Sequence, residues 1–290
     1  MFEKFESKDI NTGETTIRTL MAGKGPPLLL LHGYPQTHVM WHKIAPELAK
    51  HFTVVATDLR GYGDSGKPDS DDQHAVYSKR ATATDQVKVM EELGFHRFMV
   101  AGHDRGGRVT HRMCLDYPDH VLRASILDIV PTPTVFGTIN QRVATAYYHW
   151  FFLIQPFDFP ETLIGANPEY YLRKTLRSWS ASETFSDEAF AEYLRCFRET
   201  RTIHATCEDY RAGASIDLQH HQQDEGRKIA CPVQILWGEK GVVAGYDPLK
   251  VWAEWADDVS GRAMPSGHFI PEEAPKETLQ AFLEFFKPAS

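Results

Sequence analysis

The chain has 290 residues, of which 42% are apolar and 24% charged, so a disordered segment is excluded and one or two globular domains are expected. Its formal net charge of −8 opposes general binding to nucleic acid and to anionic membrane surfaces. The longest aliphatic run, Leu28 to Leu31, is too short to cross a bilayer, and Met1 to Ile10 lacks the apolar core of a signal peptide. The 4 scattered cysteines contain no CxxC pair, which favours reduced thiols over a zinc site or a disulfide framework. We therefore expect a cytoplasmic protein with no membrane or nucleic-acid partner.

Short apolar segments alternate with longer amphipathic stretches, a pattern typical of a mostly parallel sheet covered by helices. Each short segment is rich in Val, Ile, Leu or Phe and ends at polar residues or glycine, as buried parallel strands do. A helix-like stretch that runs to Tyr117 follows the third segment. The predicted strands cover residues 27–31, 52–57, 98–102, 124–130 and 233–237.

The pattern changes between residues 134 and 225, where the chain becomes helical in texture and dense in aromatic side chains. Predicted strands lie on both sides of this stretch, so it is expected to be an insertion into a single α/β domain. The prediction is therefore a core of residues 1–133 and 226–290 with a helical cap of residues 134–225.

The third predicted strand leads into Gly102-His103-Asp104-Arg105-Gly106, a Gly-x-Asp-x-Gly turn before a helix. A nucleophile elbow needs small residues beside its central residue because the turn is sharp and strained. The central residue is Asp104, and a carboxylate can displace a leaving group from saturated carbon to form an ester that water then hydrolyses. An aspartate that only caps the following helix is the simpler explanation, so this turn alone does not establish a nucleophile.

Three further motifs accompany the turn, in a fixed order along the chain. Together the four resemble the α/β-hydrolase superfamily, and within it the haloalkane dehalogenases, epoxide hydrolases and haloacetate dehalogenases, whose nucleophile is an aspartate. The resemblance covers about residue 26 to the C-terminus and implies a mostly parallel central sheet flanked by helices. It also implies that the amides of Tyr34 and Arg105 form an oxyanion hole and that His268 is the base. The accompanying motifs are His32-Gly33-Tyr34-Pro35, residues 58–65 and Ser266-Gly267-His268-Phe269.

A catalytic triad also needs a carboxylate that orients the histidine and stabilises its cation. Many relatives carry this acid after the strand that corresponds to residues 233–237, but Gly241 stands where it is expected. Some relatives, haloacetate dehalogenases included, carry it after the preceding strand, where this chain has Asp128. We predict Asp128 as the triad acid, with Glu239 and Asp247 as alternatives, because motif spacing does not fix geometry.

Arg105 and Arg108 lie in the first turn of the helix after Asp104, where each cation opposes the helix dipole at a cost of about 0.3–1 kcal/mol. Exposed arginines would be the ordinary explanation, yet an elbow faces the active-site cleft. Two guanidinium groups beside a carboxylate nucleophile favour an anionic substrate held through its own carboxylate. Relatives with neutral substrates resemble this turn but carry Trp at position 105. The segment Gly-His-Asp-Arg-Gly-Gly-Arg instead resembles the haloacetate dehalogenases, and particularly the fluoroacetate dehalogenases.

The aromatic run of residues 147–152 lies in the predicted cap, and most of it is expected to pack in the cap interior. Departure of a halide from carbon needs hydrogen-bond donors aimed at the developing anion, which imidazole, indole and phenol groups can supply. The resemblance to fluoroacetate dehalogenases implies that His149, Trp150 and Tyr210 bind the halide. Spacing alone does not indicate this role.

The sequence therefore predicts a haloacetate dehalogenase that converts haloacetates, fluoroacetate included, to glycolate and halide through an ester on Asp104, without a metal or other cofactor. An epoxide hydrolase with the same Asp-ester chemistry is the alternative because the predicted cap offers several tyrosines as donors, although Arg105 in place of Trp argues against it. A catalytically silent receptor or scaffold is disfavoured since no motif is damaged. The resemblance also raises the expectation of a homodimer.

Overall fold

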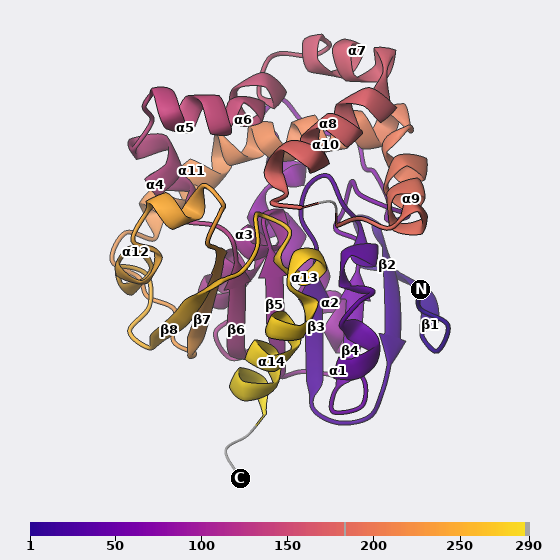
Figure 1. The fold of residues 1–290 in the computed structure, drawn as a ribbon, viewed down its shortest axis with the longest axis vertical. Helices are drawn as coiled ribbons and strands as arrows, with labels where there is room; N and C mark the ends of the chain where they lie inside the picture. Colours follow the sequence, from indigo (N-terminus) through magenta and orange to yellow (C-terminus); the bar gives the residue numbers. More distant parts are fainter. Residues whose placement is uncertain (183, 288–290) are drawn as a thin grey trace.

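The computed structural model describes residues 1–182 and 184–287. An eight-stranded sheet runs through the molecule in the order β1-β2-β4-β3-β5-β6-β7-β8 (Figure 1). β1 and β2 form an antiparallel hairpin, β2 pairs antiparallel with β4, and the remaining neighbours are parallel. The strands are β1 (Glu6–Asn11), β2 (Thr16–Ala22), β3 (Pro27–Leu31), β4 (Thr53–Thr57), β5 (Phe98–His103), β6 (Val121–Leu127), β7 (Val233–Gly238) and β8 (Val259–Met264).

The predicted strands correspond to β3 through β7, whose residues are almost all buried and therefore form continuous apolar runs. β6 begins and ends earlier than predicted, so Asp128 lies just beyond the strand rather than inside it. The sequence pattern does not predict β1, β2 and β8. These strands lie at or next to the sheet edges, and many of their residues are exposed or half-buried, so they carry no apolar run.

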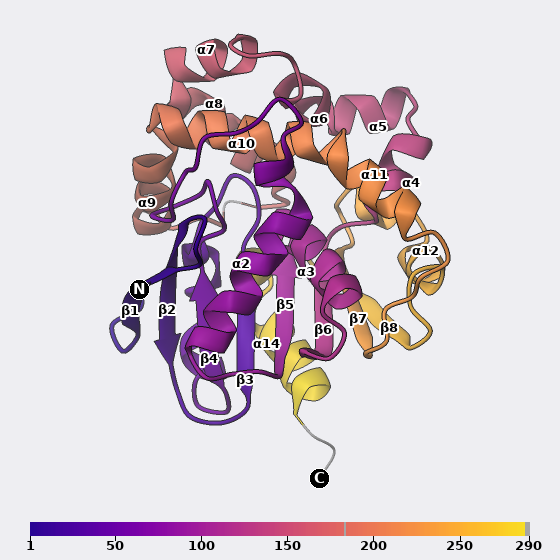
Figure 2. The ribbon, with the colours of Figure 1, turned by 180° about the vertical axis from the view of Figure 1, so that it is seen from behind.

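Helices cover both faces of the sheet. α1 and α14 lie on one face and α2 and α3 on the other, as the two opposite views show (Figures 1 and 2). No helix in the two described ranges is long and apolar enough to span a membrane. The helices outside the segment between β6 and β7 that completes the cap are α1 (Ala45–Leu48), α2 (Lys79–Glu92), α3 (Arg105–Asp116), α12 (Pro248–Ala253), α13 (Ile270–Glu273) and α14 (Pro275–Phe286).

A further helical layer lies over the carboxyl ends of the parallel strands and is formed by the chain between β6 and β7 (Figure 1). Its longest helix, α10, contacts α6, α7, α9 and α11 and so organises the layer. The architecture is the predicted α/β domain with an inserted helical cap. The cap helices are α4 (Thr132–Gly137), α5 (Gln141–Ala146), α6 (Tyr148–Leu153), α7 (Phe159–Ala166), α8 (Pro168–Trp179), α9 (Asp187–Phe197), α10 (Thr200–Gly213) and α11 (Ile216–Gln223).

Candidate active site

Asp104 occupies the turn between β5 and α3, with φ 48° and ψ −112°. A positive φ is unusual for a residue with a side chain and marks a strained position. The flanking glycines are required because a Cβ at Gly102 would lie 2.3 Å from the carbonyl oxygen of Gly106. Within the described residues, the Asp104 side chain makes no capping hydrogen bond to α3. The turn therefore has the geometry of a nucleophile elbow, and helix capping does not account for it.

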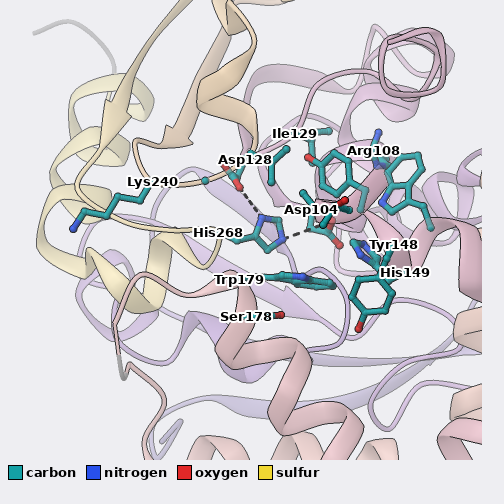
Figure 3. A pocket seen from close by; sticks show the side chains of 16 residues that line it. Asp104, Arg108, Asp128, Ile129, Tyr148, His149, Ser178, Trp179, Lys240 and His268 are labelled. Carbon is teal, nitrogen blue, oxygen red and sulfur yellow. Dashed lines mark hydrogen bonds and ion pairs between the residues drawn. The ribbon is translucent and has the colours of Figure 1, made fainter. Parts of the chain in front are cut away.

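His268 lies between two carboxylates, as Figure 3 shows. Its Nδ1 is 2.6 Å from Asp128 Oδ2, and its Nε2 is 3.8 Å from Asp104 Oδ2. The other oxygen of Asp128 accepts a hydrogen bond of 2.9 Å from the amide of Gly238. The two alternative acids lie elsewhere: Asp247 accepts from an amide at the start of α12, and Glu239 is exposed.

The electrostatics of these groups suit a nucleophile and a base. Burial opposes ionisation of Asp104, but the nearby histidines and arginines outweigh it and lower the pKa of the carboxyl. Burial also disfavours the imidazolium of His268, but the hydrogen bond and charge of Asp128 raise its pKa above the usual value. The amide of Tyr34 donates to Asp104 Oδ1 at 2.9 Å. Asp104 Oδ2 is therefore the oxygen that remains free to react.

A cavity of about 230 Å³ opens beside Asp104, between the core and the cap. Its walls combine the charged residues of the elbow and the base with aromatic side chains of α6 and the end of α8 (Figure 3). The lining residues are Asp104, Arg108, Asp128, Ile129, Thr145, Ala146, Tyr147, Tyr148, His149, Trp150, Ser178, Trp179, Lys240, Gly241, Val242 and His268.

Arg108 brings a positive charge to this cavity and is only 5% exposed. Its Nη1 donates to the carbonyl oxygen of Val130 at 3.0 Å and to Thr132 Oγ1 at 2.9 Å, and its guanidinium carbon lies 4.6 Å from the centre of the Trp150 ring. Its buried Nε has no hydrogen-bond partner among the described residues. Burial and the charge of Arg105 lower the pKa of Arg108 to about 10, so it remains a cation at neutral pH.

The sequence predicts that Arg105 and Arg108 both hold the substrate carboxylate, but Arg105 has a different environment from Arg108. Its Nε donates to Asp209 Oδ2 at 2.7 Å, and its Nη2 donates to the Asp209 carbonyl oxygen, also at 2.7 Å. The guanidinium carbon lies 4.2 Å from the ring centre of Tyr210, and the residue is not among those that line the cavity. Asp209 thus neutralises Arg105 and ties it to α10. Asp209 could not be predicted as a functional residue, because nothing in its local sequence marks it as the partner of Arg105.

The three predicted halide donors lie together on the cap side. The His149 and Trp150 rings are 5.7 and 6.1 Å from the Tyr210 ring, and the first two line the cavity. Burial lowers the pKa of His149 to about 3 and raises that of Tyr210, so both groups are uncharged at neutral pH. His149 Nδ1 and the Tyr210 hydroxyl are buried polar atoms with no partner in the described part of the chain. Buried polar atoms usually have a hydrogen-bond partner, and here an ordered water or a bound polar group can supply it.

Trp179 is a cavity residue that the sequence analysis did not identify. Its ring centre lies 4.3 Å from that of His149 and 5.6 Å from that of His268, so it packs against both a predicted halide donor and the predicted base. Its position at the last turn of α8 gave no signal, since a tryptophan there is equally compatible with core packing.

Across residues 1–182 and 184–287, no group of three or more His, Cys, Asp or Glu side chains could hold a metal ion.

Comparison with known proteins identifies the family to which the chain belongs. A family model described as the alpha/beta hydrolase fold matches residues 26–275. The chain belongs to the α/β-hydrolase family. A fluoroacetate dehalogenase from Burkholderia sp. is 44% identical over 292 residues, which cover 100% of this chain and 96% of that relative. A soluble epoxide hydrolase from Corynebacterium sp. (strain C12) is 36% identical, with 92% of each protein covered.

A solved structure of a candidate α/β hydrolase from Nostoc sp. PCC 7120 is 59% identical and has a TM-score of 0.99 over 100% of both chains. The predicted superfamily and fold are thereby confirmed. This α/β hydrolase has relatives with both of the functions considered from the sequence, a fluoroacetate dehalogenase and an epoxide hydrolase. Family membership alone does not separate them, so the choice depends on the residues of the cavity.

Proposed function

We propose that the protein is a hydrolytic haloacetate dehalogenase whose substrates include fluoroacetate. The observation that carries the proposal is Arg108, a buried cation at the cavity wall that forms no ion pair within the described residues. An unpaired buried charge costs on the order of several kcal/mol, which a bound anion offsets. A haloacetate supplies this anion through its carboxylate, whereas a neutral epoxide leaves Arg108 without a partner. The 44% identity to a fluoroacetate dehalogenase supports the same choice.

In the first step, Arg108 holds the substrate carboxylate, whereas Arg105, which is paired with Asp209 and does not line the cavity, adds no free charge there. Asp104 Oδ2 attacks the carbon that bears the halogen, and the carbon–halogen bond breaks with its electron pair going to the halide. The product is a glycolyl ester on Asp104. The departing halide is stabilised by donors from His149, Trp150 and Tyr210, two of which have unpartnered buried polar atoms.

In the second step, water hydrolyses the ester. His268 takes a proton from the water, whose oxygen attacks the carbonyl carbon of Asp104. Asp128 stabilises the imidazolium that forms, as its 2.6 Å contact with Nδ1 supports. The amides of Tyr34 and Arg105 stabilise the oxyanion; the first already donates to Asp104, and the second is the first amide of α3, which has no intrahelical acceptor. The ester C–O bond then breaks, and the His268 imidazolium gives its proton to the departing oxygen, so that glycolate leaves. Asp104 releases the remaining proton of the water to solvent, which restores its carboxylate.

We further propose that residues 134–225 act as the cap that closes the cavity, and that the protein works in the cytoplasm as a homodimer without a metal or other cofactor. Free thiols at all four cysteines support a reducing compartment. The cap exposes several large apolar side chains that a second copy of the chain would cover. These side chains are Phe157, Phe159, Leu163 and Tyr170.

An epoxide hydrolase remains the second candidate because Tyr147 and Tyr148 line the cavity and could donate to an opening epoxide ring. The 36% identity to a soluble epoxide hydrolase supports it. Both candidates use an ester on Asp104, so the substrate has to discriminate between them.

The test is release of fluoride from fluoroacetate and of chloride from chloroacetate by the purified protein, with Asp104→Ala as the control. We expect both halides from the wild type and neither from the variant. Chloride without fluoride would keep haloacetate dehalogenation and withdraw fluoroacetate as a substrate. If neither halide appears while styrene oxide is hydrolysed to the diol, the protein is an epoxide hydrolase.

A further inference from the structure

The loop that carries His268 is held by a side chain that has no part in the two chemical steps. Glu273, half-buried at the end of α13, accepts a hydrogen bond of 2.9 Å from the amide of Gly267 at Oε2. Its Oε1 accepts from the amide of Phe269, also at 2.9 Å. These two residues flank His268 in the chain, so one carboxylate holds the loop on both sides of the base.

The same carboxylate also reaches the cap. The amide of Ala181, just after α8, donates to Glu273 Oε2 at 2.7 Å. In the opposite direction, the amide of His268 donates to the carbonyl oxygen of Trp179 at 3.0 Å. A Cβ at Gly267 would lie 2.6 Å from that oxygen and 2.7 Å from the Ala181 nitrogen, so only glycine permits this approach. The end of α8 and the His268 loop therefore form one hydrogen-bonded unit.

The position of the His268 ring depends on this unit. The backbone oxygen of His268 is held separately by His103 Nε2 at 2.8 Å, and Asp128 fixes the ring through Nδ1. Among the residues that the structure describes, Nε2, which would accept the proton from water, has no such contact closer than the 3.8 Å to Asp104. Its placement is consequently set by the loop, and an error of about 1 Å in such a placement can cost roughly a hundredfold in rate.

We propose that Glu273 is a positioning residue for His268 that couples the seating of the cap to hydrolysis of the Asp104 ester. Glu273 does not line the cavity, so it acts through the loop and not on the substrate. This inference rests on the proposed function. Attack by Asp104 does not use His268, whereas ester hydrolysis does, so the two steps should respond differently to a change at Glu273.

Glu273→Gln is the first test variant. Three amides donate to the carboxylate, and a carboxamide can accept at only one of its two terminal atoms. In rapid-quench experiments with chloroacetate we expect a normal burst of one chloride per site, then turnover slowed roughly tenfold to hundredfold, with the ester accumulating on the Asp104 peptide. Glu277→Gln is the matched control: it makes the same charge change on the exposed face of α14 and should behave like the wild type.

Ala181→Pro tests the cap contact by itself because it deletes the donor and leaves the carboxylate. Ser180 is extended, with φ −82° and ψ 147°, which is the conformation that precedes proline. We expect the same slowing of ester hydrolysis to a smaller extent. An unchanged rate would overturn the coupling to the cap, and the variant also serves as the test if Glu273→Gln fails to fold.

Equal slowing of burst and turnover in Glu273→Gln, or no slowing, would overturn the positioning role. A readout independent of turnover is the NMR titration of the His268 imidazole. The charge of Glu273 contributes to the raised pKa of His268, so the variant should titrate at lower pH even if the wild type releases no halide. Absence of halide from the wild type would therefore reject the proposed function, and an unchanged His268 titration would reject the inference.

Discussion

At the scale of single residues, two hydrogen bonds orient the Arg108 guanidinium. Its Nη1 donates to the carbonyl oxygen of Val130 and to the hydroxyl oxygen of Thr132. Thr132→Val keeps the shape of the side chain and removes one acceptor. A hydrogen bond to a charged group contributes about 1.5–3 kcal/mol, so the KM for chloroacetate should rise roughly tenfold or more while kcat changes less. Steady-state kinetics measure both constants. Thr138→Val, at the exposed end of α4, is the control, and an unchanged KM in Thr132→Val would contradict the aiming role.

The raised pKa of His268 leads to a prediction for the pH dependence of ester hydrolysis, the second step. The base must be neutral to accept a proton from water, and the hydrogen bond and charge of Asp128 outweigh burial and raise its pKa above 6.5. Ester hydrolysis should therefore fail as the pH drops through this raised pKa, while the halide burst persists because Asp104 stays ionised. Stopped-flow measurement of burst and turnover across pH checks this. A turnover midpoint below pH 6.5 would contradict the assignment of His268.

The proposed triad acid, Asp128, shows how much of the site the sequence could predict. The sequence predicts Asp128 because Gly241 stands where the acid is expected at the other position. In the structure the two positions converge: a Cβ at Gly241 would lie 3.3 Å from Asp128 Oδ2. One carboxylate therefore fills a place that two segments can reach. Motif order could indicate this choice, but only the fold shows the convergence, because residues 128 and 241 lie on different strand ends.

At the scale of elements, α10 attaches the cap to α2 and α3 through one buried carboxylate. Asp209 accepts from Arg105, from Lys79 and from the hydroxyl of Tyr62, the last at 2.8 Å. Contacts of this kind join segments remote in sequence, so the motif around Asp104 indicates Arg105 but not its partner. The central strands were predicted because burial on both faces makes them continuously apolar, whereas edge strand β8, with its mixture of exposed and buried residues, gave no comparable signal.

Asp209→Asn should destabilise the protein more than the loss of one hydrogen bond would. The substitution leaves Arg105 and Lys79 as buried cations without full compensation, since Asp217 is the remaining nearby carboxylate, 3.5 Å from Lys79 Nζ. Removal of one partner from a buried ion pair costs about 3–5 kcal/mol of unfolding free energy. Denaturant titration measures this cost. Tyr62→Phe removes only a neutral donor and should cost about 1–3 kcal/mol, so equal losses in both variants would contradict the charge argument.

At the scale of the whole molecule, core and cap also meet at a buried acid. Glu272, in α13, accepts from Gln36 Nε2 at 2.5 Å and from the Tyr193 hydroxyl of α9 at 3.2 Å. Burial raises its pKa from 4.5 to about 8. Between pH 4.5 and about pH 8, Glu272 is protonated in the folded protein but ionised in the unfolded chain. The stabilisation from this group is therefore fully present below pH 4.5 and is lost as the pH rises to about 8.

Glu272→Gln is expected to remove this pH dependence, because a carboxamide resembles the protonated acid and stays neutral at every pH. Thermal unfolding of the wild type and the variant, measured side by side from about pH 5 to pH 9, isolates the group, since the other titrations are common to both proteins. The difference in Tm should move steadily in favour of the variant as the pH rises. Glu277→Gln, on the exposed face of α14, should show a constant difference. A constant difference for Glu272→Gln as well would mean that this carboxyl is ionised in the folded protein and that the contact between core and cap does not depend on its proton.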